Sequence, residues 1–151
     1  MRSLTYVLGV ALLAGCAKEK PAPAPEPPAP PPAPAPINLA DVAGNWTVKA
    51  MPETGDSVLL TYTMHATAAD TGWTITFPGR KPMAVQVMTM ADSVMVTVAP
   101  YESVLRKGMK VSTQGSMHFT GGKLMGNTTA HYVTTKADSV AHLRMEGTKA
   151  P

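Results

Sequence analysis

Most of the chain after residue 43 alternates between apolar and polar residues, and this two-residue period constrains the fold more than any other feature. In a strand, residues i and i+2 point to the same face, so each alternating run has one face for a core and one for water. Threonine is frequent on the polar face, which suits half-buried strands. The pattern predicts eight strands, near residues 44–50, 57–67, 72–77, 83–91, 93–99, 109–120, 123–134 and 139–148.

Two predicted hairpins support these strands, because each loop determines which residues of its two strands face each other. The sequences Gly121-Gly122 and Ala91-Asp92 are both suited to two-residue loops. With those loops the apolar faces of the paired strands coincide, as a shared core requires. The expected pairs are Phe119 with Leu124, Met117 with Gly126, Val111 with Tyr132, Val87 with Val96 and Val85 with Val98.

Consecutive antiparallel strands of this number can close into an up-and-down barrel, which removes exposed sheet edges. We therefore expect an all-β fold, an antiparallel up-and-down meander of about eight strands closing into a small barrel, with a β-sandwich as the alternative. Residues 100–108 break the alternation. Tyr101, Val104 and Leu105 share one helical face and Gly108 fits a C′ position, so either a single helical turn or a structured lid loop is expected there.

The first sixteen residues have the composition of an export signal. Met1-Arg2-Ser3 carries a positive charge, and residues 4–13 form an apolar run in which only Thr5 is polar. A membrane-spanning helix needs about 20 apolar residues, so this run instead fits the apolar core of a secretory signal. The following tetrapeptide, Leu13-Ala14-Gly15-Cys16, resembles the lipobox of bacterial lipoproteins. The resemblance implies that Leu13, Ala14 and Gly15 are recognised, that the leader is cut before Cys16, and that Cys16 is lipidated.

The chain is thereby divided into a signal peptide (1–15), a stalk that starts at the lipidated cysteine (16–36) and a β-barrel domain (37–151). Residues 21–36 comprise 10 Pro, 5 Ala and Glu26. Such a segment favours polyproline II, which at about 3.1 Å per residue gives a semi-rigid spacer of roughly 50 Å. The alternative to lipidation is a plain secretory signal in which the cysteine falls at this position by chance.

Location and partners follow from the same segment and from the charge. Acyl chains on Cys16 would anchor the protein in a membrane outside the cytoplasm. Ala17, where inner-membrane lipoproteins carry Asp, implies the outer membrane, with the domain facing the periplasm or the cell surface. The net charge of +3 is spread along the chain, so no nucleic-acid surface is indicated. A single cysteine excludes a disulfide framework.

A second resemblance concerns the domain. Gly44-Asn45-Trp46, on the first predicted strand, is similar to the Gly-x-Trp signature of lipocalins and related calycin barrels. In that family an arginine on the last strand packs across the tryptophan. The resemblance implies a small lipocalin-like barrel in which Arg144 packs across Trp46.

Methionine is unusually frequent and provides candidate ligand contacts. Met88 and Met95 become direct cross-strand neighbours with the 91–92 loop, and flexible methionines suit the lining of an adaptable apolar cavity. The alternative is ordinary core packing. The residues expected to line a site for a small apolar ligand are Trp46, Tyr62, Trp73, Met88 and Met95.

Thioether and imidazole groups together suit Cu(I), so a copper site is a further candidate. The adjacent pairs Met64-His65 and Met117-His118 cannot chelate one ion, because neighbouring residues of a strand face opposite sides. If Val133 pairs with Val140, His131 and His142 lie directly opposite each other and form a candidate zinc or copper site.

No catalytic motif is found: the chain has no nucleophile elbow, no His-Glu-x-x-His and no glycine-rich phosphate loop. We therefore expect a protein that is not an enzyme and has no cofactor. The expected function is that of an envelope-anchored, non-catalytic binding or interaction module carrying a small apolar ligand. The alternatives are a closed, packed barrel that meets an envelope protein, and a periplasmic protein that handles copper or zinc.

Overall fold

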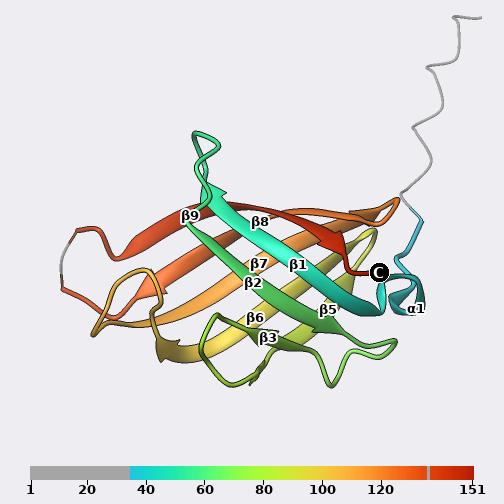
Figure 1. The fold of residues 1–151 in the computed structure, drawn as a ribbon, viewed down its shortest axis with the longest axis horizontal. Coiled ribbons are helices and arrows are strands. Elements are labelled where there is room, and N and C mark those ends of the chain that lie inside the picture. The colour runs from blue at the N-terminus through green and yellow to red at the C-terminus, as the bar shows by residue number, and fades with distance from the viewer. Residues whose placement is uncertain (1–34, 136) are drawn as a thin grey trace, which may run out of the picture. The chain divides into compact units, whose positions relative to one another are not determined.

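The computed structural model describes residues 35–135 and 137–151, and the lipobox, Cys16 and most of the stalk lie outside the described residues. The described chain is an antiparallel meander of nine strands with one short helix, α1 (Leu39–Val42), as Figure 1 shows. The expected all-β meander is thus confirmed. No helix among the described residues is long and apolar enough to cross a membrane. The strands are β1 (Gly44–Pro52), β2 (Leu60–Ala66), β3 (Thr74–Thr76), β4 (Met83–Ala84), β5 (Gln86–Met90), β6 (Ser93–Glu102), β7 (Lys110–Thr120), β8 (Lys123–Tyr132) and β9 (Val140–Lys149).

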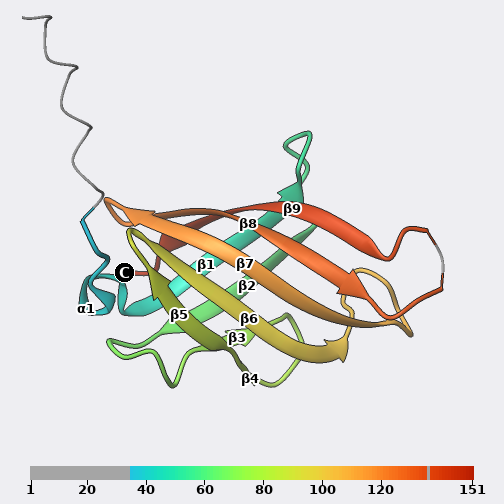
Figure 2. The same cartoon turned by 180° about the vertical axis from the view of Figure 1, so that it is seen from behind.

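All strands belong to one sheet in the order β4-β3-β2-β1-β9-β8-β7-β6-β5, in which the first strand, β1, pairs with the last, β9. The two ends of this sheet, β4 and β5, are consecutive in the chain and separated only by Val85. The sheet therefore curls until its two edges meet, and it forms a nearly closed barrel (Figures 1 and 2).

The chain changes pairing partner at Val85, which explains why nine strands are found where eight were predicted. The N–H of Val85 donates to the carbonyl of Trp73 at 3.1 Å, next to the β3–β4 ladder. From Gln86 onward the chain pairs with β6 instead. The predicted strand 83–91 is thus two strands, and the ladder of β5 with β6 starts at Gln86 and Thr97. The expected pair of Val85 with Val98 is therefore wrong.

The other predicted hairpin pairs are confirmed. Across the Gly121-Gly122 loop, Phe119 faces Leu124, Met117 faces Gly126 and Val111 faces Tyr132. Across the 91–92 loop, Val87 faces Val96. The apolar faces of these strands point into the barrel, which is where the core lies.

Aromatic rings fill the barrel at the end covered by α1. Trp46 and Trp73 are almost fully buried, at 2% and 0% exposure. The indole N–H of Trp46 donates to the carbonyl of Val42 at 2.8 Å, so it fastens α1 over this end. The ring of Phe119 meets both indoles edge-on, with centroid distances of 5.1 Å to Trp46 and 6.4 Å to Trp73. Burial of each such large ring stabilises the fold by roughly 1.5–3 kcal/mol.

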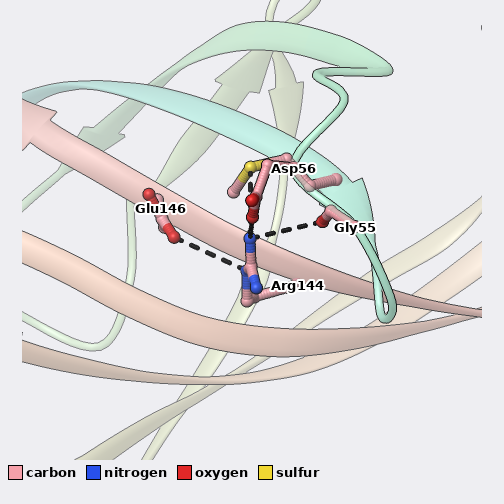
Figure 3. Close-up of polar contacts among 5 residues, drawn as sticks. Gly55, Asp56, Arg144 and Glu146 are labelled. Carbon is pink, nitrogen blue, oxygen red and sulfur yellow. Dashed lines mark hydrogen bonds and ion pairs between the residues drawn. The ribbon is translucent and has the colours of Figure 1, made fainter.

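The expected packing of Arg144 across Trp46 is wrong. Trp46 pairs with Lys149, and Arg144 lies five residues before Lys149 on the same strand, so it points to the outer face. There its guanidinium donates to Asp56 at 2.7 Å and lies 3.5 Å from Glu146, as Figure 3 shows. Arg144 therefore ties β9 to the β1–β2 loop on the outside of the barrel.

Candidate functional site

The half of the barrel away from α1 contains a cavity of about 70 Å³. Its existence follows from small residues at inward-facing positions: Ala50 on β1, Gly115 on β7 and Ala130 on β8. A larger side chain in place of Ala50 or Ala130 would take up part of the space that the strands enclose. None of the described residues that line the cavity carries a charge.

Three tyrosines, Tyr62, Tyr101 and Tyr132, line the cavity together with apolar side chains. The hydroxyl of Tyr62 donates to the sulfur of Met145 at 3.3 Å. Burial raises the pKa of Tyr62 far above its ordinary value, and the neighbouring Tyr101 raises it further. Burial also raises the pKa of Tyr101, although its hydrogen bond with Thr113 opposes this shift. The phenols of Tyr62 and Tyr101 therefore stay protonated and neutral, and they add polar groups to a mainly apolar space.

Residues 103–109, which connect β6 to β7, close this end of the barrel; we refer to them as the cap. Ser103 is buried, and its hydroxyl accepts the N–H of Arg106 at 2.9 Å. The N–H of Ser103 donates to the carbonyl of Met109 at 2.8 Å, and Gly108 takes a positive φ of 75° that closes the turn. Of the two expected alternatives for this region, the structure contains the lid loop and no helical turn.

Two arginines hold the cap in place. The guanidinium of Arg106 lies 4.1 Å from the ring centroid of Tyr132, and it donates to the carboxylate of Asp138 at 3.0 Å. Arg80, in the β3–β4 connection, donates to the carbonyls of Glu102 and Ser103. The cap is thus attached to both neighbouring loops.

The structure separates the five residues that were expected to line a ligand site. Tyr62 lines the cavity, whereas Trp46 and Trp73 belong to the aromatic packing at the α1 end. Met88 and Met95 are cross-strand neighbours, as expected. They lie on the outer face, because Val94 and Val96 beside them point inward, and Met88 is 64% exposed.

Tyr101 and Tyr132 were missed by the sequence reasoning. Tyr132 could have been found, because the predicted pair with Val111 already places it on the apolar face of β8. Tyr101 could not, because the β6–β7 register shifts between Val98 and Tyr101. That irregularity turns the tyrosine inward, and only the loss of alternation near Pro100 marks it in the sequence.

The register assumed for His131 and His142 is wrong. His131 pairs with Val140, and His142 pairs with Thr129, whose hydroxyl lies 3.3 Å from the ring nitrogen Nδ1. The loop between β8 and β9 is longer than assumed, so the two histidines are diagonal neighbours. Diagonal pairs are separated by about 7–8 Å between Cα atoms.

Within residues 35–135 and 137–151, no three His, Cys, Asp or Glu side chains are grouped so that they could hold a metal ion. No protein-family model, no curated protein and no solved structure matches the chain.

Proposed function

We propose that this protein is an envelope-anchored bacterial lipoprotein whose barrel binds a small apolar ligand, without catalysis, in the cavity beneath the cap. The observation that carries the proposal is the cavity itself: an uncharged interior lined mainly by apolar side chains, with three tyrosines and a few serine and threonine residues among them. Ligand sites in proteins commonly have this character, an apolar wall with a few polar groups that orient the ligand.

The size of the cavity limits the ligand. An engineered apolar cavity of about 150 Å³ holds benzene, and sites for drug-sized ligands occupy about 300–1,000 Å³. With the cap in place, about 70 Å³ admits only a very small molecule or the apolar end of a longer one. Displacement of residues 103–109 would extend the space toward solvent, and a neutral polar group of the ligand would meet the hydroxyls of Tyr62 and Tyr101.

The anchoring part of the proposal is supported by the sequence alone. The tetrapeptide Leu13-Ala14-Gly15-Cys16 places the single cysteine of the chain at the position that lipidation requires. Within the described residues, the chain begins next to α1, and the cap lies at the opposite end of the barrel from α1. The proposed location is the outer membrane.

A second candidate function is favoured by the small volume of the cavity. A barrel that is packed almost completely can act through its outer surface, as an interaction module that meets another envelope protein. In that case the tyrosines and the cap only complete the core.

The two candidates are distinguished by ligand titration of the full chain carrying Cys16→Ser, which removes acylation. Toluene and oleate are the probes, and methyl and aromatic NMR shifts are the readout. The proposal expects saturable shifts with at least one probe at residues around Tyr62 and Ala130. Ala130→Val, which fills the cavity, should abolish them, whereas Thr61→Leu on the outer face of β2 should not. An absence of saturable shifts with both probes would refute the ligand-binding proposal and leave the packed module.

A further inference from the structure

Thioether and imidazole groups are arranged in a row across the outer face of β5, β6, β7 and β8. In this row Met90 pairs with Ser93, Ser93 with His118, and His118 with Met125. Met95 lies two residues beyond Ser93 on β6 and so shares its face. The row shares no residue with the cavity. Its members point outward, and the residues next to them along each strand point inward and form the core.

These methionines do not serve the purpose that methionine usually has in a protein, which is to fill gaps in a core. Met90 is 60% exposed and Met125 is 58% exposed, and both flank His118. Both residues are therefore largely exposed to solvent, in a domain whose other face already supplies the core.

The spacing allows the side chains to converge. Neighbouring strands lie about 4.8 Å apart, so Met90 and His118 are roughly 10 Å apart with the short side chain of Ser93 between them. Methionine is long and flexible, so its sulfur can pass over a serine. Met125 is the direct cross-strand neighbour of His118, and Met95 is its diagonal neighbour.

A carboxylate and a hydroxyl lie beside the ring of His118. Its Nδ1 lies 3.7 Å from the carboxylate of Asp92 and 3.3 Å from the hydroxyl of Ser93. That hydroxyl donates to the same carboxylate at 3.0 Å. Histidines that bind metals almost always donate their second ring N–H to a carboxylate or a similar acceptor. Asp92 lies on the Nδ1 side, and Nε2, which lies 3.5 Å from the same Ser93 hydroxyl, is the nitrogen farther from the carboxylate and the one available to a metal ion.

We propose that Met90, Met95, His118 and Met125 form a surface site for a single soft monovalent cation, Cu(I) or its chemical equivalent Ag(I). Thioether ligands select Cu(I), and imidazole is compatible with it. Zn²⁺ sites are instead built from thiolate, imidazole and carboxylate ligands, so a set of three thioethers and one imidazole discriminates against zinc. The site shares no residue with His131 and His142, and it does not depend on the proposed ligand in the cavity.

The test is a Cu(I) titration of the full chain carrying Cys16→Ser, without an affinity tag, so that no thiol or added histidine competes. Cu(I) is supplied under reducing, oxygen-free conditions as its bicinchoninate complex, and transfer to the protein is followed by the colour of that complex. The expected result is one Cu(I) per chain. His118→Ala and the double variant Met95→Leu, Met125→Leu should each weaken binding at least tenfold.

His65→Ala is the matched control, because His65 is an exposed histidine on the outer face of β2, where it lies 2.9 Å from the side chain of Asn45. It should leave Cu(I) affinity unchanged. Methionine and leucine have similar volumes, so the leucine variants should keep the fold, and circular dichroism checks this. Copper X-ray absorption should show sulfur neighbours that decrease in the double variant. The proposal is overturned if Cu(I) stays with bicinchoninate, or if His65→Ala weakens binding as much as His118→Ala does.

Discussion

The ammonium group of Lys149 lies 5.9 Å from the centroid of the Trp46 ring, at the point where the first and last strands of the barrel pair. Lys149 thus occupies the position beside the tryptophan where an arginine was expected. Arg144 is on the same strand but on the outer face, where it binds Asp56. The difference is one of strand parity, since the two residues are separated by an odd number of positions.

Lys149→Met should destabilise the barrel slightly, because it removes the cation above Trp46 while it keeps an apolar side chain of similar length. Exposed cation–π contacts contribute about 0.5–1 kcal/mol, and that is the expected loss in the free energy of unfolding. Urea denaturation followed by tryptophan emission measures it. Arg144→Met is the control and should leave the native emission maximum unchanged. If Arg144→Met shifts the tryptophan emission maximum and Lys149→Met does not, Lys149 is not the cation beside Trp46.

Gly126, on β8, has backbone atoms of β7 closer to it than any other described glycine has neighbouring atoms. A Cβ at this position would overlap the carbonyl oxygen of Ser116 and lie 3.0 Å from the Cα of Met117. Because backbone atoms cannot move aside without disrupting the β7–β8 ladder, Gly126→Ala should cost about 1–3 kcal/mol of stability. Gly147→Ala, whose Cβ would meet no atom closer than 3.2 Å, should cost less. Thermal denaturation of both variants checks the order, and equal costs would refute it.

Much of the fold is predictable because the two-residue period assigns each side chain to a face before any pairing is known. The two-residue loops then determine the local registers, as at Phe119 and Leu124. Pairings that depend on distant or longer connections were not predictable. The register of β1 with β9, which decides whether Lys149 or Arg144 meets Trp46, joins segments separated by nearly the whole domain.

The candidate site was predicted only in part for related reasons. Met83, Val85 and Val87 stay on one face without interruption, so the sequence carries no sign that the chain changes partner at Val85. The two-residue period places Met88 and Met95 together on one face of the sheet, but it does not show which face points into the barrel. Tyr101 depends on an irregularity of the ladder near Pro100, and such irregularities have no two-residue signal.

The barrel should lose stability at high pH through Tyr62. Burial and the neighbouring Tyr101 raise the pKa of Tyr62, so the native state holds this proton where the unfolded chain releases it, above about pH 10. Stability is therefore complete below that pH and falls as the pH rises, by up to about 1.4 kcal/mol per pH unit for one group. Tyr62→Phe should flatten the dependence above pH 10. Urea unfolding at several pH values measures it, and an unchanged slope would contradict the role of Tyr62.

Arg106→Met should loosen the cap without unfolding the barrel. The variant removes the contact with the Tyr132 ring and both hydrogen bonds to Asp138. Exposed ion pairs contribute about 0–1 kcal/mol, so global stability should change little. Hydrogen exchange of the amides of Ser103 and Met109 should accelerate on the order of tenfold, because exchange reports local opening.

Asp138→Asn provides the matched control for the cap. Its backbone carbonyl still accepts the 2.7 Å hydrogen bond from Arg106, so exchange should accelerate less than in Arg106→Met. If neither variant changes exchange in residues 103–109, the cap is not held by Arg106.

Cys16→Ser tests the anchor separately from the barrel. If Cys16 is the lipidated residue, the serine variant should fail to be processed as a lipoprotein and should accumulate as an uncleaved or a soluble species. Cell fractionation and intact-mass measurement distinguish these forms from the wild type, which should carry acyl chains on residue 16. A serine variant that is still cut before residue 16 and still sediments with membranes would refute the proposed anchor.

The pairing of β1 with β9 also determines the order in which the barrel can be completed. As the chain folds, β1 can pair with β2 at once, but its other edge has no partner until β9 follows. Trp46 and Lys149, which face each other in the finished ladder, are separated by most of the domain. During that interval the open edge of β1 can pair with the wrong strand, including a strand of another chain. Closure of this seam joins the segments that are farthest apart in the domain, and contacts of such high sequence separation form slowly.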